Sequence, residues 1–153
     1  MEVRQAFLSD PRVRDLLSAH HREMVALSPP GFSFALDLDA LDSPDIVLFG
    51  AWEEAILMAV GAIKRLDAEH AEIKSMRTHP DHLCKGAGQA ILTRLLDHAR
   101  AEGMVRVSLE TGRTQPYEPA IRLYRRNGFA ESEAFASYQN GPHNQCYNLD
   151  LGR

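Results

Sequence analysis

The sequence of 153 residues has only two cysteines, no excess of basic side chains and no long apolar run. Cys84 and Cys146 are too few for a disulfide-based scaffold. No apolar run approaches the ~20 residues of a membrane-spanning helix, and the start at Met1 lacks the apolar region of a signal peptide. The formal net charge of −4 gives no general attraction to polyanions. We therefore expect a soluble, cytoplasmic protein that binds neither a membrane nor nucleic acid.

The sequence also lacks a metal-binding pattern. His79 and His82 lie close together but do not have the spacing of zinc ligands, and no cluster of His, Cys and Asp follows them. We expect no metal ion in the site.

The length fits one domain over residues 1–153, and no repeat, low-complexity tract or linker divides it. Alternating and apolar runs predict strands, and apolar residues at helical spacing predict helices between Asp10 and Ser28, after Gly88, and from Pro119 to Asn127. The connector 28–45 is expected to contain one short helix near Leu38–Leu41. Strands are expected near 3–7, 46–52, 55–66, 70–78, 105–110, 129–136 and 145–151. The three strands between residues 46 and 78 form an antiparallel meander, and a strand–helix–strand crossover then predicts one parallel pair, which is a mixed α/β (α+β) fold.

The segment after the strand at 70–78 is the most informative part of the chain. Gly86 and Gly88 lie two residues apart, directly before a predicted helix. Glycines allow backbone N–H groups to approach an anion closely, and the helix N-terminus adds a positive dipole end. The pattern is typical of a phosphate cradle, although the two glycines alone would also fit an ordinary turn.

Two motifs together resemble the GCN5-related N-acetyltransferase (GNAT) family. The loop Leu83-Cys84-Lys85-Gly86-Ala87-Gly88 is similar to the family pattern (Gln/Arg)-x-x-Gly-x-(Gly/Ala), and a later helix carries Leu123, Tyr124, Gly128 and Phe129 in the family order. The resemblance covers about residues 46 to 150, and the run 109–117 is similar to one bacterial branch of small acetyltransferases. It implies a mostly antiparallel mixed sheet, flanked by helices, in which one parallel pair of strands splays apart.

The resemblance further implies that acetyl-CoA binds in the wedge between the splayed strands. Leu83 and Cys84 depart from the family's usual Gln or Arg and Gly, so one phosphate contact is expected to be missing, with Lys85 offsetting part of it. For Cys84, a small residue replacing glycine is favoured over a reactive thiol. The residues expected to contact acetyl-CoA are Met76, Arg77, Thr78, Leu83, Cys84, Lys85, Gly86, Ala87, Gly88, Gln89, Tyr117 and Tyr124.

The same resemblance gives Tyr124 the role of the acid that protonates the departing CoA thiolate. An attacking amine must lose a proton, and Glu72 and Glu110 are the two candidates for the base. His20, His21 and Tyr117 are candidates for the wall of the acceptor pocket, with exposed helix positions as the alternative for the two histidines.

We therefore predict an N-acetyltransferase that moves an acetyl group from acetyl-CoA directly to a primary amine of a small molecule or peptide. The alternatives are a non-catalytic module that binds acyl-CoA and an acyltransferase with another donor or acceptor. The sequence does not identify the acceptor, and it does not decide between a monomer and a homodimer.

Overall fold

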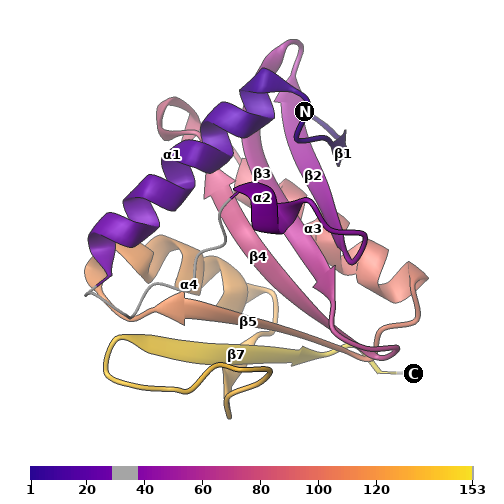
Figure 1. The fold of residues 1–153 in the computed structure, drawn as a ribbon, viewed down its shortest axis with the longest axis vertical. Helices are drawn as coiled ribbons and strands as arrows, with labels where there is room; N and C mark the ends of the chain where they lie inside the picture. The colour runs from indigo at the N-terminus through magenta and orange to yellow at the C-terminus, as the bar shows by residue number, and fades with distance from the viewer. Residues whose placement is uncertain (29–37, 153) are drawn as a thin grey trace.

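The computed structural model describes residues 1–28 and 38–152, and this part of the chain forms one seven-stranded sheet with helices on both faces (Figure 1). The strand order is β1-β2-β3-β4-β5-β7-β6, and of these neighbouring pairs only β4 and β5 run parallel. The strands are β1 (Glu2–Ala6), β2 (Ile46–Glu53), β3 (Ile56–Arg65), β4 (His70–Thr78), β5 (Arg106–Gly112), β6 (Ala130–Ser132) and β7 (Asn144–Asp150). The helices are α1 (Pro11–Leu27), α2 (Leu38–Leu41), α3 (Ala87–Ala101) and α4 (Glu118–Arg126), with short 3-10 turns η1 (Pro80–His82) and η2 (Gln115–Tyr117). The predicted mixed fold with one parallel pair is confirmed.

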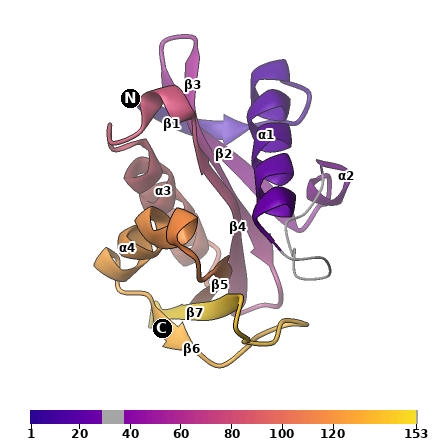
Figure 2. The same ribbon diagram turned by 90° about the vertical axis from the view of Figure 1, so that its left-hand side faces the viewer.

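The helices divide between the two faces of the sheet. Figure 2 shows α1 and α2 on one side and α3 and α4 on the other. The apolar stripe of α3, with Ile91, Leu92 and Leu95 fully buried, packs in the larger core, and Val13, Leu16 and Leu17 of α1 pack in the smaller one. Both stripes follow the helical period that is visible in the sequence.

Local signals set several of the boundaries. Asp10 caps α1 by accepting a hydrogen bond from the backbone N–H of Arg12 at 2.9 Å, and Pro11 occupies the first turn, where its missing N–H costs nothing. Gly103 follows α3 with a φ of +79°, the left-handed conformation that favours glycine. The predicted short helix at Leu38–Leu41 is confirmed, while the part of the connector at 29–37 lies outside the described residues.

The parallel pair is short and then opens. β4 and β5 pair only at three positions, from His70 with Arg106 to Glu72 with Ser108, yet β4 continues to Thr78 and β5 to Gly112. An extra residue in β4 shifts its register with β3, and Ser75 lies there with a φ of +56°. Such a bulge bends the strand that contains it. The two strands therefore diverge as a V, which Figure 1 shows between β4 and β5.

One strand is shorter than the sequence suggests. A strand near 129–136 was expected, but β6 ends at Ser132. Beyond Ser132 the chain leaves the sheet edge, and the rings of Phe135 and Tyr138 pack together with centroids 5.0 Å apart. Phe135 also packs against His70 of β4, at 5.7 Å between centroids. The alternating pattern in this segment thus reflects packing of a loop against β4.

Candidate active site

The open side of the wedge offers unpaired backbone. Past Glu72, β4 keeps its pairing with β3, but within the described residues no strand pairs with its other edge. Unpaired strand N–H and C=O groups need partners, and an extended ligand can supply them as an added strand. Met76, Arg77 and Thr78 lie on this stretch, as expected for backbone contacts to an extended substrate.

The glycine loop lies beside the end of β4. A side-chain carbon built on Gly88 would lie 3.4 Å from both the Thr78 hydroxyl and a methyl group of Leu123, so this position joins β4, α3 and α4 closely. Gly86 precedes α3 with a φ of +84°, and no side chain caps the helix. The first N–H groups of α3 are therefore free of a capping side chain, and a helix N-terminus of this kind favours an anion.

The side chains of the loop before Gly86 are exposed. Leu83 and Cys84 are exposed, and the Lys85 Nζ lies 3.2 Å from the Nδ1 of His82. Cys84 has a φ of +61°, a conformation in which glycine is usual. The loop therefore keeps the backbone shape that a glycine would favour at position 84, although its side chains differ from the family pattern.

Gln89 lies in the first turn of α3, and its side chain is hydrogen-bonded within the protein. Its side-chain amide exchanges two hydrogen bonds of 2.9 Å with that of Asn127, and it also donates to the Thr93 hydroxyl at 3.0 Å. The side chain of Gln89 thus joins α3 to the end of α4.

Tyr124 and Tyr117 border the wedge from α4 and η2. The Tyr124 ring is buried and packs edge-on against Phe129, with centroids 5.9 Å apart, and burial raises the pKa of its phenol. A phenol with a raised pKa stays protonated at neutral pH, as a proton donor must. The Tyr117 ring covers Gly112 so closely that a side-chain carbon there would lie 2.2 Å from it, which only glycine avoids.

Glu72 forms a buried cluster with two residues. Its Oε2 accepts hydrogen bonds from the Lys74 ammonium at 2.8 Å and from the Tyr138 hydroxyl at 2.6 Å, and Lys74 also donates to the Tyr138 oxygen at 2.7 Å. The side chains of Glu72 and Lys74 are only 4% and 8% exposed. The Glu72 carboxylate is thus held by two donors on one oxygen, which favours an anchoring role.

Glu110 lies on the other arm of the wedge, past the last position at which β5 pairs with β4. Burial raises the pKa of Glu110, and a hydrogen bond from Asn144 and the charge of Lys74 act in the opposite direction. A carboxylate with a raised pKa accepts a proton more readily at neutral pH than an exposed one.

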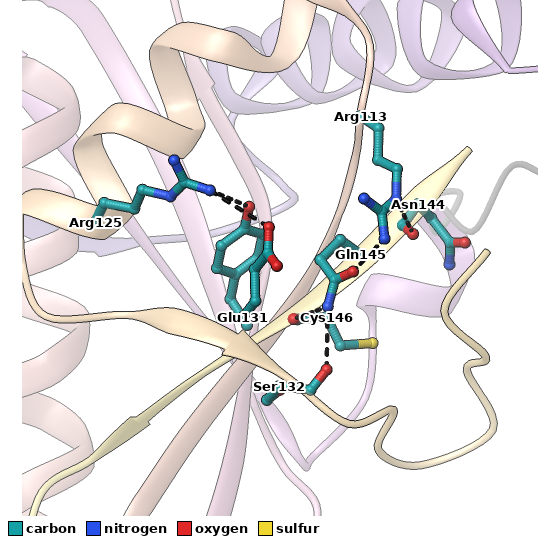
Figure 3. Close-up of polar contacts among 8 residues, drawn as sticks. Arg113, Arg125, Glu131, Ser132, Asn144, Gln145 and Cys146 are labelled. Carbon is teal, nitrogen blue, oxygen red and sulfur yellow. Dashed lines mark hydrogen bonds and ion pairs between the residues drawn. The ribbon is translucent and has the colours of Figure 1, made fainter. Parts of the chain in front are cut away.

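Polar contacts hold β7 beside this carboxylate. Arg113 follows β5, and its Nε donates to the Asn144 carbonyl at 2.9 Å while its Nη2 contacts the Gln145 side chain. Gln145 in turn donates to the Ser132 carbonyl at 3.1 Å. Figure 3 shows Arg113 reaching to β7 and Gln145 extending toward Ser132. The end of β5, the start of β7 and the end of β6 are therefore fixed relative to one another.

Comparison with known proteins identifies the family of this chain. The model of the acetyltransferase (GNAT) family matches residues 11–129. The uncharacterized N-acetyltransferases YsnE of Bacillus subtilis and YedL of Escherichia coli are 40% and 39% identical to this chain, over 93% and 94% of it and 94% and 91% of their own lengths. The chain belongs to the GNAT acetyltransferase family.

Solved structures agree on the fold. A Klebsiella pneumoniae protein assigned as an acyl-CoA N-acyltransferase matches this GNAT chain with a TM-score of 0.82 at 24% identity, over 98% of this chain and 97% of the other. A GNAT family acetyltransferase of Elizabethkingia anophelis with acetyl-CoA bound matches with a TM-score of 0.71 at 15% identity, over 98% and 97%. At these identities the likeness establishes the shared fold.

The fold brings most of the predicted GNAT site residues together at the wedge. The end of β4, the start of α3 and the α4 helix with Tyr124 meet around Gly88, and Glu72 and Glu110 lie close enough for their charges to interact. His20 and His21 are half-buried on α1, and His20 interacts electrostatically with Arg77.

Sequence reasoning missed Lys74, Tyr138 and Asn144. Lys74 follows Glu72 by two residues on a strand, so its place on the same face was predictable from the alternation. Tyr138 lies 66 residues from Glu72, and Asn144 belongs to a different strand from Glu110. No motif in the sequence pointed to either of them.

Among the described residues there is neither a cluster of metal-binding side chains nor a membrane-spanning helix. In residues 1–28 and 38–152, no group of three or more His, Cys, Asp or Glu side chains could hold a metal ion. Across the same residues, no helix has the length and apolar character needed to span a membrane.

Proposed function

We propose that this GNAT acetyltransferase transfers the acetyl group of acetyl-CoA directly to a primary amine of a small molecule or peptide. The observation that carries the proposal is the wedge itself. An unpaired strand edge at Met76–Thr78, an uncapped helix N-terminus at Gly86, the buried Glu72 carboxylate and the half-buried Glu110 carboxylate meet at one opening of the sheet. The pantetheine amides fit the strand edge and the pyrophosphate fits the helix N-terminus.

The side chains of the wedge divide the proton transfers between them. Glu110, whose pKa is raised by burial, accepts the proton that the amine loses as it attacks the thioester carbon. The carbon–sulfur bond then breaks, and the Tyr124 phenol gives its proton to the CoA thiolate. Glu72, bound by Lys74 and Tyr138, holds the segment before β7 against β4. The route needs no covalent enzyme intermediate.

Binding of acetyl-CoA is tested by thermal unfolding with a matched pair of glycine variants. Gly86 and Gly103 both have a positive φ and nothing within 4 Å of an added side-chain carbon, but they lie at opposite ends of α3. Both Gly86→Val and Gly103→Val should lower the melting temperature through backbone strain. Saturating acetyl-CoA should raise the melting temperatures of the wild type and of Gly103→Val, and should leave the melting temperature of Gly86→Val unchanged. No stabilisation of the wild type would refute the assignment of the wedge.

Turnover is tested by thiol release from acetyl-CoA in the presence of a panel of primary amines. Release that depends on an amine, with an N-acetylated product in the mass spectrum, supports the proposal. Stabilisation by acetyl-CoA without release for any amine would favour the non-catalytic acyl-CoA-binding module. Release with propionyl-CoA or with alcohols alone would favour another donor or acceptor.

A further inference from the structure

A second polar group lies where α1 crosses the end of β4. Arg77 of β4 forms an ion pair with Glu23 of α1, and the Arg77 side chain is 16% exposed against 43% for Glu23. His20 and His21 precede Glu23 on the helix and are half-buried. The guanidinium is thus the more buried member of its ion pair, with two imidazoles on the helix that carries its partner.

Three nitrogens of this group have no hydrogen-bond partner in the part of the chain that the structure describes. They are the Nε of Arg77 and the Nδ1 atoms of His20 and His21, and all three are buried. A buried polar group without a partner costs about 1–3 kcal/mol, and native proteins contain few of them. A bound polar ligand would supply the hydrogen-bond partners that these three nitrogens lack.

The charge of the group selects a monoanion. A guanidinium has five N–H donors in a planar fork, and the ion pair with Glu23 is made through Nη1. Burial, together with the nearby Arg77, lowers the pKa of His20 to about 4, so this imidazole is neutral at pH 7 and can donate one N–H without adding charge. The ion pair with Glu23 leaves the Arg77 Nε–H without a partner, so the single guanidinium can accept one further anionic group. A carboxylate, with one charge and two acceptor oxygens, therefore suits the group better than a doubly charged phosphate.

The group lies on the acceptor side of the wedge. Ala71 and Ile73 of β4 pack in the core with α3, so the alternating side chains of Glu72 and Lys74 lie on the α1 face, and the contact with Glu23 places the Arg77 side chain on that face too. Met76 packs in the α3 core, on the opposite face. Leu109 of β5 also packs in the α3 core, so the neighbouring Glu110, the proposed base, lies on the α1 face. The Arg77 guanidinium therefore lies on the same face of the sheet as the proposed base.

We propose that Arg77, with His20 and His21, forms a subsite for a carboxylate of the acceptor, so that the substrate is a primary amine that also carries a carboxylate group. This proposal rests on the proposed function and names the class of its acceptor. The amine would lie toward Glu110 on one arm of the wedge and the carboxylate toward Arg77 on the other.

The test compares amines that differ only by the carboxylate: γ-aminobutyrate against butylamine, and phenylalanine against phenethylamine. In the wild type, kcat/KM should favour the carboxylate-bearing member by about tenfold or more, which corresponds to about 1.4 kcal/mol. Arg77→Gln should bring the ratio to about one. Arg22→Gln removes an equal charge from an exposed position of α1 and should keep the ratio.

A third variant should change the KM in the opposite direction, which a general loss of structure would not do. Glu23→Gln removes the carboxylate that competes for Arg77, so the KM for γ-aminobutyrate should fall while that for butylamine stays unchanged. A wild-type ratio near one, or a ratio that survives Arg77→Gln in a variant still stabilised by acetyl-CoA, would overturn the proposal.

Direct binding separates this proposal from the proposed function. Butyrate is titrated into the wild type and Arg77→Gln and followed by ligand-observed NMR. Binding of butyrate that needs Arg77, without turnover of any amine, would leave the carboxylate subsite standing and refute the acetyl transfer. If butyrate does not bind through Arg77, and amines are acetylated equally well with and without a carboxylate, the subsite is refuted while the acetyl transfer stands.

Discussion

Replacing Glu72 with Gln should destabilise the protein strongly. The change keeps the size of the side chain but removes the charge that balances the Lys74 ammonium, which is 8% exposed and lies 2.8 Å from the Glu72 carboxylate. Breaking one partner of a buried ion pair costs about 3–5 kcal/mol, because the other charge stays buried without compensation. The Tyr138 hydroxyl, 2.6 Å from the same oxygen, loses a charged acceptor as well.

The loss is measured by urea unfolding at pH 7, followed by the fluorescence of Trp52, the single tryptophan of the chain. For a chain of this size, the expected loss corresponds to a fall in the melting temperature of roughly 6–20 °C. The double variant Glu72→Gln with Lys74→Met should recover most of the loss, because the unbalanced ammonium is then absent. A loss below about 1 kcal/mol, the scale of a surface ion pair, would refute the reasoning.

The same variant tells an anchoring Glu72 from a catalytic one. As an anchor, Glu72→Gln should retain most of its turnover at a temperature where it is fully folded, since Glu110 remains to accept the proton. A variant that is as stable as the wild type but loses turnover by about 10²-fold or more, the scale of general base catalysis, would identify Glu72 as the base.

Four further changes test the remaining assignments. Glu110→Gln should lower kcat/KM by about 10²-fold or more and remove the rise of activity with pH that reflects the raised Glu110 pKa. A carboxyl group whose pKa is raised in the folded state destabilises the fold once it is ionised. The neutral Gln should therefore also raise the melting temperature at pH 7. A lower melting temperature would contradict the conclusion that burial raises the Glu110 pKa. Tyr124→Phe should keep acetyl-CoA affinity within a few fold while turnover falls by about 10²-fold, and near wild-type turnover would make Tyr124 a packing residue. Leu83→Arg should tighten CoA binding, with a gain that shrinks as salt is raised; unchanged affinity for both CoA and dephospho-CoA would show that position 83 does not face the pyrophosphate. Cys84→Gly should remove about 1 kcal/mol of strain from the left-handed backbone at this position, partly offset by the greater chain entropy of glycine in the unfolded state. A fall in the melting temperature would show instead that packing of the Cys84 side chain stabilises the loop.

The sequence by itself determined the elements and their order. The strand at His70–Thr78, the cap at Asp10 and the short helix at Leu38–Leu41 lie where the pattern predicts them, and the glycine loop and the Tyr124 helix identified the family. These features depend on residues that are neighbours in the chain, because side-chain period, caps and turn glycines act over a few positions.

Only the tertiary structure decided which distant residues contact one another in the site. Tyr138 meets Glu72 across 66 residues, the Gln89 side chain pairs with that of Asn127, and Arg77 faces Glu23 of a helix that precedes it by some fifty residues. The burial that raises the Glu110 pKa likewise arises only once β7 lies beside β5. Such contacts depend on how the sheet bends at the Ser75 bulge and where a loop without a motif comes to lie, and no local pattern specifies either.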